Sequence, residues 1–476
     1  MITKHIARVL ICLLTLVAIA KAQGTGATIQ GSVTDPNRAV IPEASVTVTN
    51  TETNIQRTAI TGAAGIYVIP NLPPGRYRVQ VVLPGFKISV HENIDLVVGQ
   101  QLTLNTVLEA GEITEQKTVT SEAPLVDISS AQVAGVVGER EVKDLPLNGR
   151  SVDDLITLNP ATVNTTAVKG EASGSSGPGN NFAIAGQRPG HNIFLWNGVE
   201  YPGGSNAESS TPGGVSGQLL GIDAVREFNV VPSIESAEAG HRVGGQVAVV
   251  TKSGTNSFHG TVFEFLRNSA LDARNFFDQD AIPPFKRNQF GGSAGGPISK
   301  DRTFIFGNYE GFQQRLGLSR VAVVPDAEAR QGFLPCNIVS PAPNVCPQSG
   351  RINVNLGRGV APYFNLWPAP NGGELLQNGL PTGTARAFSN PNNAIREDFG
   401  IARLDHSFSN RDTLRGAYTI DDGDSTTPGQ NPFSLNLLRQ KTQILTLSEL
   451  HVISPSVVND FTAGLSRVHY GVMLPL

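Results

Sequence analysis

The sequence predicts a mainly β protein in which two β-rich parts flank a small mixed α/β segment. Three observations support this fold class. The 476 residues include 51 glycines and 31 prolines, which is typical of a turn-rich β protein. Short β-branched runs recur between turn residues, and no long amphipathic helical pattern is found. The net charge of -4 and the 16% of charged residues give no reason to expect nucleic-acid binding.

The first residues have the layout of a secretory signal peptide, which we place at residues 1–22. Lys4 and Arg8 precede an apolar run at residues 9–20, and the small-x-small site Ala20-Lys21-Ala22 follows. The run is short for a helix that spans a bilayer. The chain is therefore predicted to be exported.

Two cysteines, Cys336 and Cys346, remain after the predicted cleavage. They flank the proline-rich segment NIVSPAPNV. Because exported proteins meet oxidising conditions, we predict that these two cysteines form a disulfide.

Residues 23–110 are predicted to form a small β-sandwich of the immunoglobulin-like or transthyretin-like kind. Turn residues separate six strand-like runs: IQGSVTD, ASVTVTNT, RTAITG, GIYVIPNL, GRYRVQVVL and QLTLNTVLEA. Leu72, Tyr77, Val79 and Val81 are interpreted as core residues. Residues 111–125 are polar and are predicted to be a linker that contains one extended segment.

Residues 126–240 are predicted to form a small mixed α/β domain. The run EREVKDLP predicts a short helix that ends at its proline, and Ser151 opens a stretch that resembles a capping box. Val152, Leu155 and Ile156 make an apolar face in the segment that follows Ser151. The runs FAIAGQ, NIFLWNGVE and AVREFNVV are predicted strands.

Residues 241–476 are predicted to be β-structure again. GGQVAVVTKSGTNSFHGTVFEF is interpreted as two strands around a turn, and IARLDHSFSNRDTLRGAYTI is the clearest hairpin. In VVNDFTAGLSR, Val457, Phe461, Ala463 and Leu465 share one face. This alternation fits membrane strands with lipid outside and water inside, and it also fits a soluble sandwich with one wet face. Periodicity alone leaves both interpretations open.

The sequence contains no recognisable catalytic constellation. The GGSAG run at residues 291–295 matches the G-x-S-x-G pattern, but Pro297 and a predicted strand follow instead of the required helix. A glycine-rich turn is the better interpretation. None of the eight histidines begins an H-E-x-x-H zinc motif, and the His91-Glu92 pair is interpreted as a surface pair. The acidic cluster at residues 421–424 lacks calcium-loop spacing and is interpreted as a solvated loop. We therefore expect no enzyme activity, no metal and no cofactor.

These pieces, in this order, resemble the TonB-dependent outer-membrane transporters, specifically the Oar-like group with an N-terminal carboxypeptidase-regulatory-like module. GSVTDPNRAVIPEASVTVTNTET and GIYVIPNLPPGRYRVQVVLPGFK look like that module. LPLNGRSVDDLITLNP, NIFLWNGVE and AVREFNVVPSIESAEAG look like the plug of this family. GGQVAVVTKSGTNSFHGTVFEFLRNSALDARNFF and RNQFGGSAGGPI look like the first barrel strands. The resemblance covers nearly the whole chain.

The resemblance implies a plug domain at residues 126–240 and a partial antiparallel transmembrane β-barrel at residues 241–476. It implies a location in the outer membrane of a Gram-negative-type bacterium and the import of a bulky nutrient, a carbohydrate or a peptide. The implied partners are TonB, outer-membrane lipid and the transported substrate, whose binding residues the sequence does not reveal. The alternative is an exported surface adhesion or carbohydrate-binding β protein.

By resemblance, residues 115–120 lie at the position of the family's TonB box; they are Glu115, Gln116, Lys117, Thr118, Val119 and Thr120. An extended segment at this place can add a strand to the sheet edge of a partner. Trp196, Asn197 and Gly198 stand at a plug motif where the family often has an Asp before the Gly.

The resemblance also implies that Val247, Val249, Phe263 and Phe265 lie on barrel strands whose apolar face meets lipid. At about 10 residues for each membrane strand, residues 241–476 would make about 8 to 10 strands. Plugged transporters use about 22 strands, and a barrel of about 8 is filled by its own side chains. We therefore expect that this chain lacks the rest of its barrel.

Overall fold

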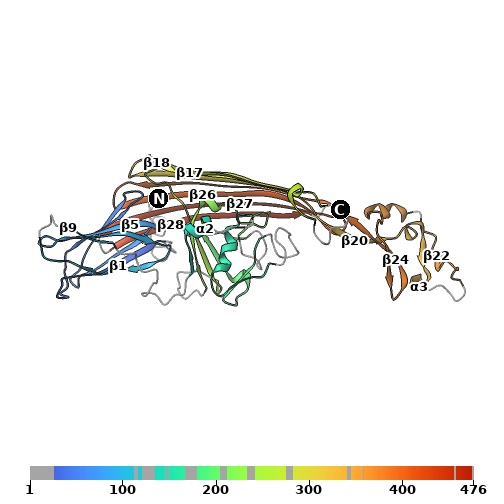
Figure 1. Cartoon of the computed structure of the whole chain (residues 1–476), viewed down its shortest axis with the longest axis horizontal. Coiled ribbons are helices and arrows are strands. Elements are labelled where there is room, and N and C mark those ends of the chain that lie inside the picture. The colour runs from blue at the N-terminus through green and yellow to red at the C-terminus, as the bar shows by residue number, and fades with distance from the viewer. Residues whose placement is uncertain are drawn as a thin grey trace, which may run out of the picture.

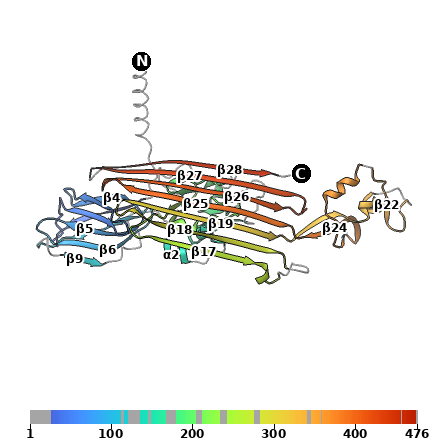
Figure 2. The same cartoon turned by 90° about the horizontal axis from the view of Figure 1, so that it is seen from above.

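The computed structural model describes residues 26–111, 116–120, 135–144, 147, 149–166, 179–203, 212–232, 242–274, 282–339, 345–357, 359–454 and 457–473. The predicted signal peptide lies outside these residues. A long curved sheet dominates the molecule, and the N-terminal domain lies at one end of it (Figures 1 and 2). Under its middle lies a second domain, which we call the plug domain after the expectation above, and a small lobe lies at its other end. The predicted mainly β class is confirmed. Within the described ranges, no helix is long and apolar enough to cross a membrane.

The N-terminal domain consists of two sheets around one apolar core, as a β-sandwich requires. The first sheet contains β1 (Ala27–Thr34), β4 (Ile66–Leu72), β7 (Gln101–Thr103) and β8 (Thr106–Val107). The second contains β2 (Ser45–Asn50), β3 (Gln56–Ile60), β5 (Gly75–Val82), β6 (Ile88–Leu96) and β9 (Gln116–Thr120). Leu72, Tyr77, Val79 and Val81 are buried in the core as predicted. Sequence reasoning missed β6, because the polar run His91-Glu92-Asn93 interrupts its apolar pattern.

The plug domain is built on a five-stranded sheet in the order β10-β15-β16-β13-β14. Its strands are β10 (Gly135–Val137), β13 (Ile193–Trp196), β14 (Val199–Glu200), β15 (Val225–Val231) and β16 (Gln246–Thr251), and a separate pair is formed by β11 (Thr162–Asn164) and β12 (Phe182–Ile184). The helical segments are α2 (Glu139–Asp144), η2 (Val152–Leu158), η3 (Pro189–His191) and η4 (Ile222–Ala224). The helix predicted from EREVKDLP is confirmed as α2.

The capping box predicted at Ser151 is wrong. No side-chain hydrogen bond caps η2. The Ser151 hydroxyl instead accepts a hydrogen bond from the backbone N–H of Leu219 at 3.0 Å and donates to Asp153. Ser151 therefore ties two plug segments together, while the predicted apolar face of η2 is buried as expected.

The prediction that Val247 and Val249 lie on a barrel strand is also wrong. Their strand, β16, pairs with β13 in parallel and with β15 in antiparallel orientation, inside the plug sheet. Both side chains belong to the plug core. The following strand lies in a different sheet, so the two predicted strands around a turn are not a hairpin. The residues from Val247 to the end of β16 are buried on both faces of the strand. A strand buried on both faces shows no alternation of polar and apolar residues, so the sequence does not indicate to which sheet it belongs.

The long curved sheet, which we call the strand wall, has seven strands in chain order and antiparallel neighbours. They are β17 (His259–Asn268), β18 (Phe285–Ser299), β19 (Thr303–Gly317), β25 (Asn392–Ser407), β26 (Asp412–Pro428), β27 (Leu435–Ser454) and β28 (Val457–Met473). The turns at the end beside the N-terminal domain are short and those at the other end are longer, which is the pattern of outer-membrane barrels.

The strand count differs from the expected 8 to 10 for two reasons. The wall strands reach 20 residues in β27, about twice the length that crosses a membrane. In addition, the segment between β19 and β25 folds into a separate lobe rather than into wall strands. Among the described residues, the edge strands β17 and β28 do not pair with each other.

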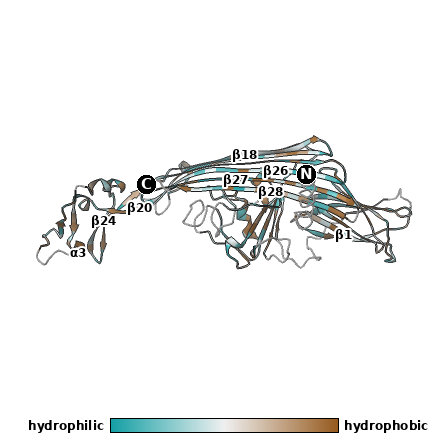
Figure 3. Cartoon of the chain, turned by 180° about the vertical axis from the view of Figure 1, so that it is seen from behind, coloured by the Kyte–Doolittle hydropathy of each residue, from teal (hydrophilic) through white to brown (hydrophobic). Residues whose placement is uncertain are grey.

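The inner face of the wall is the face that contacts the plug domain, and Phe263 and Phe265 lie on it. They share this face with Gln289, which hydrogen-bonds to the plug backbone at Gly149. The expectation that these two rings meet lipid is therefore wrong. The opposite, outer face exposes a series of large apolar side chains: Val262, Leu404, Tyr418, Leu445, Leu447, Phe461 and Leu465. Figure 3 shows polar and apolar residues following one another along these strands.

The segment between β19 and β25, residues 318–391, forms what we call the distal lobe. It contains β20 (Arg320–Pro325), β23 (Glu374–Gln377), β24 (Leu380–Ser389), a pair formed by β21 (Phe333–Pro335) and β22 (Arg351–Asn353), and the short helical segments η7 (Ala329–Gln331), α3 (Cys336–Val339) and η8 (Ala361–Leu366). A single turn of 3-10 helix, η6 (Ser269–Leu271), follows β17 near the same end of the wall.

Candidate functional site

The candidate site is the contact between the plug domain and the inner face of the wall, which we call the plug interface. The predicted plug motif lies in it. Trp196 is only 1% exposed, and its indole Nε1 donates to the hydroxyl of Thr419 at 3.1 Å. The indole packs edge-on against Tyr201 and Phe399, with ring centroids 5.8 and 6.1 Å away. The motif therefore joins the plug core to the wall strands β25 and β26.

Asn197 and Gly198 form the two-residue turn between β13 and β14. Both have positive φ, 51° and 85°, which a tight hairpin of this kind requires. The Asn197 side-chain oxygen accepts hydrogen bonds from the backbone and the hydroxyl of Thr251, at 3.0 and 3.1 Å. Asn thus provides the acceptor oxygen that an Asp would provide at this position.

Two carboxylates of the wall hold the plug domain by its backbone. Glu310 accepts from the N–H of Gly221 at 2.9 Å, and Glu397 accepts from the N–H of Ser216 at 2.6 Å. Both glutamates are 0% exposed. A buried carboxylate is costly unless it is hydrogen-bonded or paired. Any movement of the plug that breaks these bonds must therefore bring water or new donors to the wall.

Arg150 provides the matching positive charge from the plug domain. It donates to Asp223 at 2.9 Å, and its Nε lies 3.7 Å from Glu310. Its guanidinium carbon lies 3.8 Å from the centre of the Phe263 ring and 5.1 Å from that of Phe265. Cation–π contacts of this kind are favourable, especially where water is excluded. The inward position of the two rings is thereby explained.

The plug backbone approaches the wall closely at two glycines, where an added β-carbon would meet a wall side chain. A β-carbon on Gly214 would lie 2.1 Å from the Glu397 carboxylate. A β-carbon on Gly221, whose φ is +88°, would lie 2.2 Å from the Phe399 ring. The close approach is what allows the backbone N–H groups to reach the wall carboxylates.

The N-terminal domain contacts the plug domain at two consecutive residues of β15. Both terminal nitrogens of Arg226 donate to Glu52 at 3.2 Å. Glu227 is 5% exposed and accepts a hydrogen bond from the N–H of Val98. Burial raises the pKa of Glu227 to about 7, against the lowering effect of that hydrogen bond. The docking of the two domains therefore depends on a titratable group.

The TonB-box-like segment is found partly in the structure. Glu115 lies outside the described residues, and Gln116–Thr120 form β9. β9 pairs in parallel with β6 at the edge of a sheet of the N-terminal domain. The predicted extended segment is thus a strand, and it belongs to the sandwich rather than to a free linker.

In the distal lobe, Cys336 and Cys346 are joined by a disulfide, with their Cα atoms 5.9 Å apart. A second link is an ion pair in which Arg351 donates to Asp326 at 2.8 Å. Burial opposes ionisation of Asp326, but hydrogen bonds from Arg351 and from the Ala329 backbone lower its pKa. These links constrain a lobe that has little apolar core.

Other sequence candidates have structural roles. Ser293 lies within β18 rather than in a turn, and its hydroxyl hydrogen-bonds to that of Thr261 at 2.8 Å, so the GGSAG run does not form the strand–turn–helix elbow that a nucleophile requires. His91 is buried against the Thr106 hydroxyl at 3.1 Å, so its interpretation as a surface residue is wrong.

The acidic cluster at residues 421–424 lies inside β26 and not in a loop, so its interpretation as a solvated loop is wrong too. Asp421 instead accepts from the Tyr201 hydroxyl at 3.4 Å.

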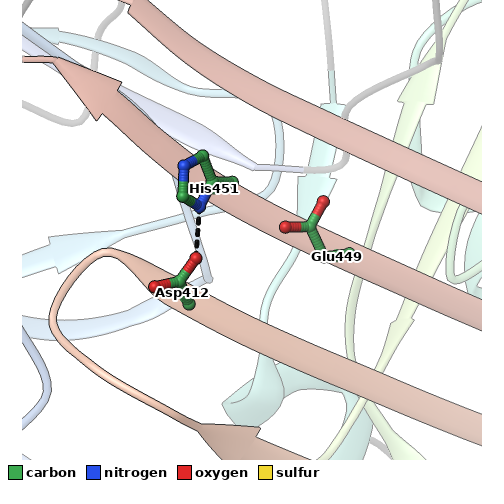
Figure 4. A group of neighbouring side chains, drawn as sticks. All are labelled: Asp412, Glu449 and His451. Atoms are coloured by element: carbon green, nitrogen blue, oxygen red, sulfur yellow. Dashed lines mark hydrogen bonds and ion pairs between the residues drawn. The ribbon is translucent and has the colours of Figure 1, made fainter.

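One group of side chains in the described part of the chain is close enough to hold a metal ion: Asp412, Glu449 and His451, with ligand atoms within 4.8 Å of one another. Figure 4 shows that the three come from neighbouring wall strands and that His451 hydrogen-bonds to Asp412. The Asn459 amide donates to Glu449 at 3.3 Å. These hydrogen bonds already account for the arrangement of the three side chains.

The functional residues that sequence reasoning missed are the plug-binding side chains of the wall, Glu310, Glu397 and Gln289. Each is a polar residue on the inner side of a strand in which polar and apolar residues alternate. The alternation indicates that such a residue does not face lipid, but it does not indicate what the residue contacts. The partners are mostly backbone N–H and C=O groups. A partner of this kind leaves no residue-type signal in the sequence.

Two family models match the chain. An outer membrane beta barrel domain matches residues 250–475, and a carboxypeptidase regulatory-like domain matches residues 28–109. The TonB-dependent transporter Oar of Myxococcus xanthus is 28% identical over 299 residues, which are 59% of this chain and 26% of Oar. The chain thus spans about a quarter of the length of this curated relative.

Solved outer-membrane proteins resemble the structure over part of their length. The transporter YddB from Escherichia coli has 14% identity and a TM-score of 0.44, with 70% of this chain and 38% of YddB covered. The siderophore receptor PiuA from Acinetobacter baumannii has 13% identity and a TM-score of 0.35, with 71% of this chain and 45% of PiuA covered. The chain is a homologue of the Oar transporter. This homology and the match to an outer membrane beta barrel domain indicate that the chain is located in the Gram-negative outer membrane.

Proposed function

We propose that this homologue of a TonB-dependent transporter takes part in the import of a bulky nutrient across the outer membrane, with the plug domain as the gate. The observation that carries the proposal is the plug interface. Glu310 and Glu397 of the wall accept hydrogen bonds from the plug backbone. The inner face of the wall is polar at these contacts and packs closely against the plug glycines. A domain held on the inner face of membrane strands by such bonds blocks passage until it moves.

The test is uptake by cells that produce this protein. Cells with and without this protein would be offered labelled oligosaccharides and peptides, with TonB present or absent. We expect uptake of at least one substrate class to require both proteins. Uptake that continues at the same rate without TonB would contradict the proposal.

We further propose that residues 115–120 are the TonB contact. β9 is the last strand of its sheet, and within the described residues only β6 pairs with it. An unpaired strand edge can accept a strand from a partner protein through main-chain hydrogen bonds. TonB would therefore either extend this sheet at β9 or replace β6 as the partner of β9.

A proline at Val119 tests this contact because proline has no backbone N–H to donate. Val119→Pro should reduce transport while the amount of protein in the outer membrane stays the same. The matched control is Val119→Thr, which keeps both the backbone donor and the preference for strands. Unchanged uptake in the proline variant would place the TonB contact elsewhere, without affecting the proposal that the plug is a gate.

A further inference from the structure

A cavity of about 60 Å³ lies where the N-terminal domain, the plug domain and the wall meet. Four arginines line it: Arg57, Arg226, Arg403 and Arg415. The carboxylates among its described lining residues are Glu52 and Asp405. A neighbouring cavity of about 70 Å³ is lined by three of the same arginines. The junction of the three parts is therefore unusually rich in positive charge for a partly enclosed space.

Two of the four arginines are neutralised by their own partners. Arg226 donates twice to Glu52, and the Nε of Arg403 donates to both oxygens of Asp405, at 3.0 and 3.1 Å. Arg403 also donates to the backbone oxygen of Thr251 at 2.8 Å. These two arginines are thus occupied in holding the plug domain to its neighbours.

Arg57 and Arg415 have no such carboxylate partner among the residues that the structure describes. Arg57 lies on β3 and is only 8% exposed, and no acceptor among the described residues lies within hydrogen-bond reach of its Nη1. Arg415 approaches from the wall strand β26. Burial, and then the charge of Arg415, lower the pKa of Arg57 to about 10. The two guanidinium groups therefore repel each other across the cavity.

The carboxylates around the cavity do not form ion pairs with Arg57 or Arg415 in the described part of the chain. Beyond the cavity lining, the charge of Asp460 acts on both Arg57 and Arg415. Glu52 and Asp405 are already hydrogen-bonded to Arg226 and Arg403, and no ion pair joins Asp460 to Arg57 or Arg415 among the described residues. A buried guanidinium group without a counter-charge or a hydrogen-bond acceptor is costly. The cavity is therefore one that an anion would stabilise.

We propose that this cavity binds a small oxyanion of the phosphate class, which bridges Arg57 of the N-terminal domain and Arg415 of the wall. The guanidinium group is a planar fork that binds the oxygens of phosphate by two parallel hydrogen bonds. The volume suits such an ion, because one water molecule requires roughly 10–15 Å³ and the cavity has room for about four to six of them.

The location favours a free anion over a lipid headgroup. Arg415 shares its side of β26 with Thr419, which contacts the plug domain. The apolar side chains of the outer face lie on the opposite side of the strands. The anion would therefore come from the aqueous space around the N-terminal domain, and it would clamp that domain to the wall. This inference does not depend on transport.

The experiment measures phosphate binding to the chain, purified from outer membranes in detergent. Calorimetric titration with inorganic phosphate, at an ionic strength held constant with sodium chloride, should show one site. Arg57→Gln and Arg415→Gln should each weaken binding about tenfold or more, since each removes a charged two-bond contact. Arg78→Gln is the matched control, because Arg78 lies exposed on the same sheet, and it should bind phosphate as the native chain does.

A second variant keeps the test decisive if the glutamine variants fold poorly. Arg415→Glu places a carboxylate beside Arg57 and so provides the anion from within the chain. Its melting temperature in phosphate-free buffer should be no lower than that of the native chain, and phosphate should no longer raise it. Phosphate that stabilises the native chain no more than chloride, or binding that persists in both glutamine variants, would overturn the proposal.

Discussion

Replacing Gly221 by alanine should loosen the plug domain from the wall. Two costs add at this position. Its φ of +88° is a left-handed conformation, which costs a residue with a β-carbon about 1–2 kcal/mol. The new methyl group would lie 2.2 Å from the ring of Phe399, which is fully buried, and overpacking of this kind costs about 1–3 kcal/mol. The expected total loss is about 2–5 kcal/mol in the free energy of plug release.

The assay uses the fluorescence of Trp196, which lies in the plug interface. The chain has two tryptophans, and Trp367→Phe provides a background in which Trp196 alone emits. A urea titration then follows the plug as it leaves the wall, because the emission of a buried indole shifts to longer wavelength when water reaches it. The matched control is Gly186→Ala: Gly186 also has positive φ, +75°, but a β-carbon there meets nothing within 4 Å.

The control variant should lose only the backbone cost, about 1–2 kcal/mol. The difference between the two variants therefore measures the close approach of the plug backbone to Phe399. Equal losses would refute the reasoning, because they would mean that the wall yields to the added methyl group and does not position the plug by contact.

Three further outcomes are expected. The pKa of Glu227 is raised from 4.5 to about 7, so its contribution to the stability of the docked domains is full below about pH 4.5 and is lost as the pH rises through about 7. The stability lost between these two pH values is at most about 3 kcal/mol. Glu227→Gln should remove this pH dependence from melting curves. Thr419→Val removes the acceptor of the Trp196 indole and should cost about 1–3 kcal/mol in the urea titration, whereas no loss would mean that water replaces the hydroxyl. Non-reduced peptides of the distal lobe should contain the linked cysteine pair by mass spectrometry, and two alkylatable thiols in fresh protein would contradict the disulfide.

The strands and their order could be predicted from the sequence wherever one face of a strand is apolar and the other polar. The hairpin of β25 and β26 and the outward side of β28 are examples, since alternation with period two directly reports two different environments. Alternation does not report which environment is inside. Phe263 and Phe265 are apolar and yet face the plug, because Arg150 lies over their rings.

The candidate site was less predictable than the fold, for a physical reason. The contacts of Glu310 and Glu397 are made with backbone N–H groups that every residue except proline carries. The sequence signal that does exist is glycine, since Gly214 and Gly221 allow the approach. In a chain with 51 glycines, however, the two that matter cannot be told from those that form turns.

The topology also indicates how a pull at residues 115–120 would reach the plug domain. The first described plug strand after β9 is β10, which has three residues. Within the described ranges it pairs with β15 alone, through Gly135, Val136 and Val137. It lies at the edge of the plug sheet, so few hydrogen bonds resist its removal, each with a net value of about 1 kcal/mol. The central strand β16, by contrast, is paired on both sides.

A pull that starts at β9 should therefore open the plug from its edge. In a single-molecule experiment with the force applied through a cysteine at Thr118, the first rupture should release β10 alone, while the Trp196 fluorescence still reports a buried indole. Wall contacts such as that of Glu397 with Ser216 should break only in a later event at higher force. If the first event instead releases the plug sheet as a unit together with the Trp196 signal, the wall contacts are weaker than the sheet edge, and the plug moves as a rigid body.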